Sequence, residues 1–406
     1  MSAASGHSVV ILADLLIDGT GGDPIGDAGV IIEGNRIRAA GPRRRLGTLS
    51  GTADVVDLRG TGRVVMPGLV DAHSHLWHFF RGDVQVRQFD SPAYIVARAV
   101  RNAARRLDEG VTTTREMGTP ENLDLGLRDA VADGVVAGPR IFASGMGLAV
   151  TGGMYGKQAP FRRQTMEFTG ADEARRAVRR QIDAGVDFIK LFATAGIGER
   201  GHSQMTFEEV AAATDEGHKA GKTVAAHAIA ADGIKICVRA GVDTIEHGKA
   251  LDDEAVAMMR DAGVALVPTL AVGRTIAERA VELGRGAEVA ENARRVLEVH
   301  QRSVRLAYEA GVKIVVGTDP AYGDSMAREC ELLVQTCLTP MEALVGATRR
   351  GAEILRLGDD FGTLEEGKRA DLIVLARSPV EDIRALSEVE YVFKAGIAVR
   401  RPQAAR

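Results

Sequence analysis

The sequence predicts an α/β protein: a (β/α)8 TIM barrel over residues 66–361 and a small β-sandwich domain assembled from residues 1–65 and 362–406. Three observations lead to this prediction. Short apolar runs alternate with helix-length amphipathic segments through the middle of the chain. Both chain ends contain strand-like runs without such helices. The length of 406 residues fits one large α/β domain together with a smaller one.

Both chain ends are rich in strand-like sequence runs. The N-terminal runs are rich in Val and Ile, alternate partly in polarity, and are separated by Gly, Asp and Asn turns. Neither end alone has enough strands to bury a core, so we expect the two ends to form one β domain. The runs are residues 8–19, 28–41 and 54–65 at the N-terminus and 370–379 and 389–401 at the C-terminus.

The middle of the chain repeats a strand-helix unit. Thr206 with Glu209 three residues later forms a capping-box pattern at one helix start. Several helices end on glycine, as at Gly185 and Gly263. A doubly wound open sheet is the alternative, but no GxGxxG follows an early strand to support it. The eight strand candidates are residues 64–75, 111–115, 140–145, 186–192, 223–227, 242–247, 264–270 and 312–319.

Composition narrows the class of protein. The 51 basic and 55 acidic residues give a net charge of −4, and aromatic residues make up 4%, so neither number favours nucleic-acid binding or an anionic membrane surface. No apolar run approaches the ~20 residues of a membrane span, and the N-terminus lacks a signal-peptide pattern. We therefore expect a cytoplasmic protein, with Cys237, Cys330 and Cys337 reduced.

Six candidate metal ligands end the predicted strands, on the face where a barrel gathers its active site. His73 and His75 are two residues apart, so both imidazoles point to one side and can hold one ion. Each residue alone has an ordinary structural explanation; for example, Lys190 could be a salt-bridge partner. Together the donors suit Zn2+ or a similar ion. They are His73, His75, Lys190, His227, His247 and Asp319.

These residues carry a family resemblance. PGLVDAHSH, FIKLFATAG, AAHA, TIEHG and GTD resemble motifs of the amidohydrolase superfamily, closest to the metal-dependent Xaa-Pro dipeptidases (prolidases) and the imidazolonepropionase-like proteins. The likeness covers nearly the whole chain, including the closing GTLEEGKRADLIVL. These motifs are highly specific for the superfamily and much less specific for the substrate.

The resemblance implies a binuclear centre of two divalent ions, with Zn2+ expected. His73, His75 and Asp319 would hold one ion, His227 and His247 the other, and Lys190, carboxylated by CO2, would bridge them. Two ions about 3.5–4 Å apart can share a hydroxide and polarise a carbonyl. Asp319 would act as general base and then general acid. The expected reaction is hydrolysis of an amide-type C–N bond in a small molecule.

The sequence departs from the dipeptidase pattern in two loops. Where that branch carries a TGGHG-like segment, this chain has TGGMYG with Met154 and Tyr155, and AIAADG follows His227. Both changes make the pocket more apolar, which favours an aryl amide, urea, carbamate or lactam over a substrate with a free carboxylate. Further pocket candidates on loops are Trp77, His78, His202, Arg274 and Tyr322. Arg115 could bind an anion, but an internal ion pair is favoured.

Three alternatives stay open. An Xaa-Pro dipeptidase proper would share the whole ligand set. A mononuclear deaminase or cyclic-amide hydrolase of the imidazolonepropionase type would lack the bridging lysine and usually place a Glu near the strand 5 histidine. A barrel without enzymatic activity is disfavoured, because all six ligands are intact. Barrels of this kind often associate, so a homo-oligomer also stays open.

Overall fold

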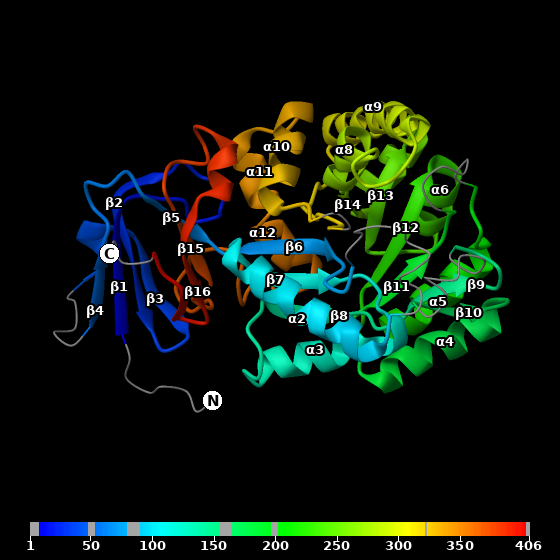
Figure 1. The fold of residues 1–406 in the computed structure, drawn as a ribbon, viewed down its shortest axis with the longest axis horizontal. Helices are drawn as coiled ribbons and strands as arrows, with labels where there is room; N and C mark the ends of the chain where they lie inside the picture. The colour runs from blue at the N-terminus through cyan, green and yellow to red at the C-terminus, as the bar shows by residue number, and fades with distance from the viewer. Residues whose placement is uncertain are drawn as a thin grey trace.

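The computed structural model describes residues 8–47, 53–78, 90–154, 164–195, 202–320 and 323–402. Strands from both chain ends share one sheet in the order β17-β16-β15-β5-β1-β2-β3, with β4 paired to β1. In Figure 1 the blue strands β1 to β4 and the red β16 lie at the same end of the molecule. The strands are β1 (Ser8–Leu16), β2 (Ile25–Glu33), β3 (Arg36–Pro42), β4 (Asp54–Asp57), β5 (Val64–Pro67), β15 (Leu372–Leu375), β16 (Val389–Lys394) and β17 (Ile397–Arg400).

This mixed sheet has its own hydrophobic core. The antiparallel pairing of β15 with β5 joins the two chain ends directly. Apolar side chains that alternate along the strands, among them Ile11, Ile32 and Phe393, gather in one cluster. The remaining parts of this region are the short 3-10 helices η1 (Arg43–Arg45) and η4 (Ile383–Ser387).

The middle of the chain forms two parallel sheets, ordered β6-β7-β8 and β10-β9-β11-β12-β13-β14. Their strands run through the centre of the larger part of the molecule in Figure 1. Parallel pairing requires crossovers, which the intervening helices supply. The strands are β6 (Leu69–Ser74), β7 (Val111–Glu116), β8 (Arg140–Ala143), β9 (Gly147–Val150), β10 (Thr165–Phe168), β11 (Ile189–Phe192), β12 (Val224–Ala230), β13 (Thr244–Ala250) and β14 (Ala265–Val267).

Two connections link these sheets. The chain passes directly from β8, which pairs with β7, to β9, which pairs with β11, and Asp187 N donates to Ala143 O beside this break. On the other side, residues 313–319 lie between β14 and β6. Val315 N donates to Leu266 O, and Ala72 N donates to Val316 O. Asp71 adds a side-chain link, because its carboxylate accepts from the backbone N–H and hydroxyl of Thr318.

Two details differ from the sequence prediction. Residues 312–319 were expected to form a strand, but their β pairing is limited to one isolated bridge, between Ile314 and Leu266. The pair β9 and β10 was not predicted. The capping box of Thr206 and Glu209 is confirmed at the start of α5, and Gly185 and Gly263 end α4 and α7 in the left-handed conformation as expected.

Amphipathic helices cover the parallel sheets and bury one large apolar cluster against them. Within the described ranges, no helix combines the length and apolar character that crossing a membrane requires. All three cysteines are free thiols, as expected. The helices are α2 (Pro92–Asp108), η2 (Pro120–Asn122), α3 (Leu123–Ala132), α4 (Ala171–Ala184), α5 (Phe207–Lys219), α6 (Ala231–Arg239), α7 (Asp253–Ala262), α8 (Leu270–Arg279), α9 (Ala287–Glu309), α10 (Met326–Thr336), α11 (Pro340–Gly346) and α12 (Arg349–Ile354).

Candidate metal centre

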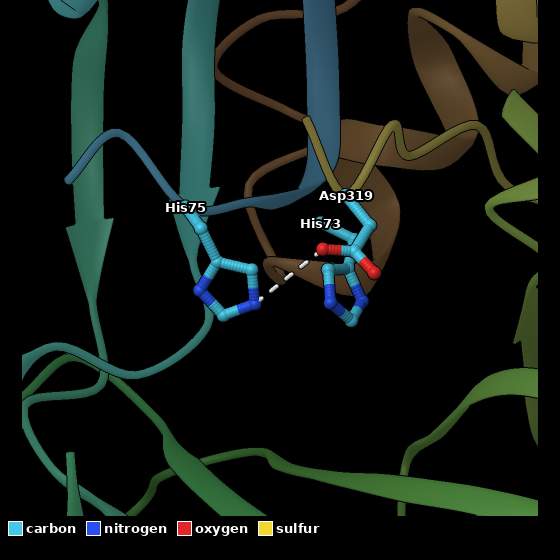
Figure 2. A group of neighbouring side chains, drawn as sticks. All are labelled: His73, His75 and Asp319. Carbon is cyan, nitrogen blue, oxygen red and sulfur yellow. Dashed lines mark ion pairs between the residues drawn. The ribbon is translucent and has the colours of Figure 1, made fainter. Parts of the chain in front are cut away.

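Three of the predicted ligands meet where β6 and residues 313–319 end side by side. His73 is in β6, His75 follows it, and Asp319 N donates to His73 O at 2.7 Å. Figure 2 shows His75 and the Asp319 carboxylate facing each other, with 3.8 Å between Nε2 and Oδ1. One donor atom from each of the three residues lies within 4.8 Å of the others. This spacing can hold a metal ion.

The other three predicted ligands extend the cluster across β11, β12 and β13. The ring centroids of His73 and His247 are 4.9 Å apart, and those of His247 and His227 are 4.6 Å apart. Lys190 enters from β11, with Nζ 5.1 Å from the Phe192 ring, which in turn lies 5.8 Å from the His227 ring. Adjacent parallel strands therefore bring the imidazoles and the lysine to one edge.

Burial of this cluster leaves polar atoms without a hydrogen bond. Lys190 Nζ and His227 Nε2 are buried without a hydrogen-bond partner among the residues that the structure describes. Burial lowers the pKa of Lys190 to about 8, against the opposing charge of Glu246. Burial also places the pKa of His75, His227 and His247 well below the usual value. The neutral imidazole is the form that binds a metal.

A buried chain of polar groups orients His73. Its Nδ1 lies 2.6 Å from Glu246 Oε2, and the other carboxylate oxygen accepts from Arg115 Nη2 at 2.6 Å and from the Thr244 hydroxyl at 2.6 Å. Burial alone would raise the pKa of Glu246, but Arg115 and His73 lower it to about 2. With Nδ1 committed to Glu246, the ring presents Nε2 as its free donor atom.

Glu246 was not among the predicted site residues, although an acid inside the apolar strand TIEH was a usable signal. For Arg115, the favoured interpretation as an internal ion pair is confirmed by its contact with Glu246.

His247 has a similar support. Its Nδ1 lies 2.7 Å from the Thr269 hydroxyl, and its carbonyl is 2.8 Å from His300 Nε2. Three residues here adopt positive φ angles: His247 at 71°, Thr269 at 58° and Asp319 at 47°. Such angles are costly for residues other than glycine and concentrate at functional sites. The surrounding hydrogen bonds hold two candidate ligands in this strained backbone.

Comparison with known proteins identifies the family of the chain. The amidohydrolase family model matches residues 64–399. The chain belongs to the amidohydrolase family. It is 29% identical to an ochratoxinase from Aspergillus niger, with 97% of this chain and 87% of that protein covered. As an amidohydrolase with these relatives, it is a hydrolase that acts on carbon–nitrogen bonds.

Two solved structures resemble this amidohydrolase over nearly its full length. A Xaa-Pro dipeptidase with methionine bound in its active site has a TM-score of 0.87 at 32% identity, covering 97% of this chain and all of the other. A prolidase complexed with N-methylphosphonate-L-proline has the same TM-score at 30% identity, with the same coverage.

The predicted pocket residues of the amidohydrolase, apart from the metal-ligand candidates, lie in different surroundings. Trp77 is buried in an apolar cluster, and its indole N–H donates to Gly118 O at 2.8 Å. His78 is buried and stacks on His75, with 4.5 Å between ring centroids. Met154 packs against Phe192 in a small apolar cluster next to the metal-ligand candidates.

Two further candidates are more exposed. The His202 side chain is 86% exposed and lies 3.9 Å from Asp232, and Arg274 pairs with Glu278 along α8. Tyr155 and Tyr322 lie outside the described residues.

Lys249, which lies two residues beyond His247 in β13, was not among the predicted site residues. Its side chain is buried, and burial lowers its pKa to about 8 while the Asp319 carboxylate opposes that shift. Lys249 lines a cavity of about 1000 Å³ among α6, α7 and α9, together with Ile229, Ile236 and His202. This cavity adjoins the metal-ligand cluster because β12 and β13 contribute to both.

Proposed function

We propose that this amidohydrolase is a binuclear metal-dependent enzyme that cleaves an amide-type C–N bond in an N-acyl or peptide-like compound, an aryl amide, a carbamate or a urea. One observation carries the proposal: four imidazoles, a carboxylate and a buried lysine meet at one edge, and Lys190 Nζ and His227 Nε2 have no hydrogen-bond partner in the described part of the chain. Buried polar atoms without partners are costly, and metal coordination would remove that cost.

The donor set suits two ions. His73, His75 and Asp319 would hold one of them, because their donor atoms already lie within 4.8 Å of one another. His227 and His247 would hold the second. Lys190 would bridge the ions after its neutral amine adds CO2 and releases a proton, which converts a buried cation site into an anionic ligand. Mixed nitrogen and oxygen donors favour Zn2+.

When bound, the ions would lower the pKa of the attacking water and polarise the scissile carbonyl. Asp319 would accept the proton of that water and deliver it to the leaving nitrogen, as base and then acid. Its carboxylate makes no side-chain hydrogen bond to a described residue beyond the 3.8 Å approach to His75, so it is available for this transfer. Glu246 and Thr269 would hold His73 and His247 in the required tautomers.

The similar proteins support two different classes of substrate. Likeness to a prolidase and a Xaa-Pro dipeptidase supports cleavage of dipeptides, and likeness to an ochratoxinase supports a larger amide. A mononuclear cyclic-amide hydrolase or deaminase is the alternative function, and the presence of Lys190 in the cluster argues against it.

We also propose that the two parallel sheets and residues 313–319 close into a (β/α)8 barrel spanning 66–361. The hydrogen bonds on both sides of the break at β8 and along residues 313–319 support this closure. Residues 1–65 and 362–406 would then form the small β-sandwich domain, and the whole protein would work in the cytoplasm.

The metal content of Lys190→Ala tests the binuclear proposal. We expect two ions per chain in the zinc-loaded protein and one or none in the variant, with hydrolysis of N-acyl and prolyl dipeptides, aryl carbamates, phenylureas and lactams screened in parallel. Lys219→Ala, at an exposed helix lysine paired with Asp215, is the matched control and should keep both ions. One ion in both wild type and Lys190→Ala would contradict the proposal.

A further inference from the structure

Lys249 is a buried cation without an internal partner. The residue is 5% exposed, and it makes neither a hydrogen bond nor an ion pair through Nζ with any residue that the structure describes. The backbone at this position is fixed, because Ser303 Oγ donates to Lys249 O at 2.8 Å and Leu251 N donates to Ser303 Oγ. The strand therefore fixes the backbone from which the Lys249 side chain reaches the cavity.

Another lysine of the same cavity shows the contrast. Lys235 pairs with Asp252 at 2.8 Å and also with Glu254, and its side chain is partly exposed. Its charge is therefore neutralised within the protein. The carboxylate that acts on Lys249 is that of Asp319, which the proposed function commits to a metal ion. A buried charge without a partner is costly, so an anion from outside the chain would stabilise it.

The surroundings indicate what kind of molecule carries that anion. The cavity of about 1000 Å³ is lined by apolar side chains, including Ile229, Ile236, Met258 and Val296, and also by charged ones such as Arg239 and Arg295. Lys249 lies two residues beyond His247 in β13, and Ile229, which also lines the cavity, lies two residues beyond His227 in β12. An anionic group bound here is therefore next to the site of hydrolysis and next to an apolar compartment.

We propose that Lys249 is a specificity-determining residue that binds a carboxylate of the substrate, whose apolar remainder occupies the cavity among α6, α7 and α9. This inference rests on the proposed amide hydrolysis and narrows its substrate to acidic amides, such as N-acyl amino acids with a bulky apolar group. It reverses the expectation of a substrate without a free carboxylate, because Lys249 supplies a cation that Met154 and the loop after His227 lack.

Two substrates that differ only in the carboxylate test this role. N-acetyl-L-phenylalanine and N-acetyl-2-phenylethylamine share the scissile amide and the phenyl group. For the zinc-loaded wild type we expect a kcat/KM about tenfold to a hundredfold higher on the acid, as a charge-assisted contact provides. In Lys249→Gln this preference should fall to near one, because KM for the acid rises while the neutral amide has no carboxylate for Lys249 to bind. Lys249→Arg should restore part of the preference.

The control is Lys219→Gln, which neutralises an exposed lysine on α5 and should leave the preference intact. An equal loss on both substrates in Lys249→Gln would assign Lys249 a structural or general catalytic role and overturn the inference. A wild type that prefers the neutral amide would overturn it as well, while supporting the proposed hydrolysis.

A binding measurement distinguishes failure of this inference from failure of the proposed function. If the metal-loaded wild type hydrolyses neither compound, the proposed reaction fails for this class, and calorimetry with the same two compounds decides the role of Lys249. Binding of N-acetyl-L-phenylalanine at least about tenfold tighter than the neutral amide, lost in Lys249→Gln, would support the inference. Equal affinity of wild type and Lys249→Gln for the acid would overturn it.

Discussion

Glu246 lies at the centre of a buried polar chain that runs from Arg115 to His73. Each carboxylate oxygen has a charged or ring partner at 2.6 Å, and both Glu246 and Arg115 are almost fully buried. In such a place one carboxylate performs two tasks: it neutralises the guanidinium and fixes the tautomer of an imidazole. These tasks can be separated by mutation.

Glu246→Gln should weaken metal binding and destabilise the fold. The loss of the charge leaves Arg115 buried without an anion, which costs about 3–5 kcal/mol, and the second-sphere change should weaken zinc binding about tenfold to a hundredfold. A competing chromophoric chelator measures the affinity, and urea unfolding measures the stability. Glu246→Gln with Arg115→Met should regain most of the stability but not the affinity. Unchanged zinc affinity in both variants would contradict the assigned role.

Asp319→Asn isolates the proton transfer. The amide keeps the shape of the side chain but cannot accept the proton of the attacking water, so kcat should fall by roughly 10²–10⁴ on any substrate that wild type hydrolyses. Stability should change little, because the Asp319 side chain has one described ion pair, at 3.8 Å. Steady-state kinetics and metal content are measured together. Activity near wild type with two ions bound would refute the role of Asp319.

The residues that sequence reasoning missed share a physical cause. His73, His75 and Asp319 were found because their spacing and strand-end positions are visible locally. The role of Glu246 depends on Arg115, which is 131 positions away, and the role of Lys249 depends on a cavity lined by three helices. Long-range partners of this kind leave no periodic signal in one sequence.

At the level of elements, strand β8 ends in a kink that carries the chain into β9. Gly145 has φ of +65°, and a Cβ there would lie 2.4 Å from Gln181 Oε1 and 2.6 Å from Asn122 Oδ1. The sequence predicted the strand over 140–145 but not its continuation, because the turn is held by distant side chains: Asp124 Oδ2 accepts from Gly145 N, and Asn122 Oδ1 accepts from Met146 N. Local signals, such as the capping box of Thr206, were predicted correctly because both partners lie within one helical turn.

Gly145→Ala should destabilise the protein more than an equivalent change elsewhere. Alanine in the left-handed region costs about 1–2 kcal/mol, and the contacts with Gln181 and Asn122 should add roughly as much again. Gly263→Ala is the matched control, because Gly263 has φ of +70° and no heavy atom within 4 Å of its Cβ position. Urea unfolding of both variants measures the difference. Equal free energies of unfolding would show that the surroundings of Gly145 yield without cost.

At the level of the whole molecule, strands of both chain ends are joined to the parallel sheets. Ile17, Val64 and Ile373 of the terminal region belong to the same apolar cluster as Leu69 and Val111 of the parallel sheets. Arg140 of β8 also pairs with the almost fully buried carboxylate of Asp371 at 2.8 Å. The sequence predicted that the chain ends come together, since neither had enough strands alone, but it did not reveal these contacts between the two regions. A shared core of this kind predicts that both regions unfold together.

Ile11→Val tests that cooperativity. Ile11 is fully buried in β1 and belongs only to the apolar cluster of the terminal sheet, so removing one methylene should cost about 1 kcal/mol there. If the two regions unfold as one unit, the free energy of hydrogen exchange should fall by the same amount for the slowest amides of β1 and for those of β12, which lies in the parallel sheet. Native-state exchange measured by NMR or mass spectrometry resolves the two sets. A decrease confined to β1 and its neighbours would show that the terminal sheet unfolds independently, and the metal-ligand cluster would then survive its loss.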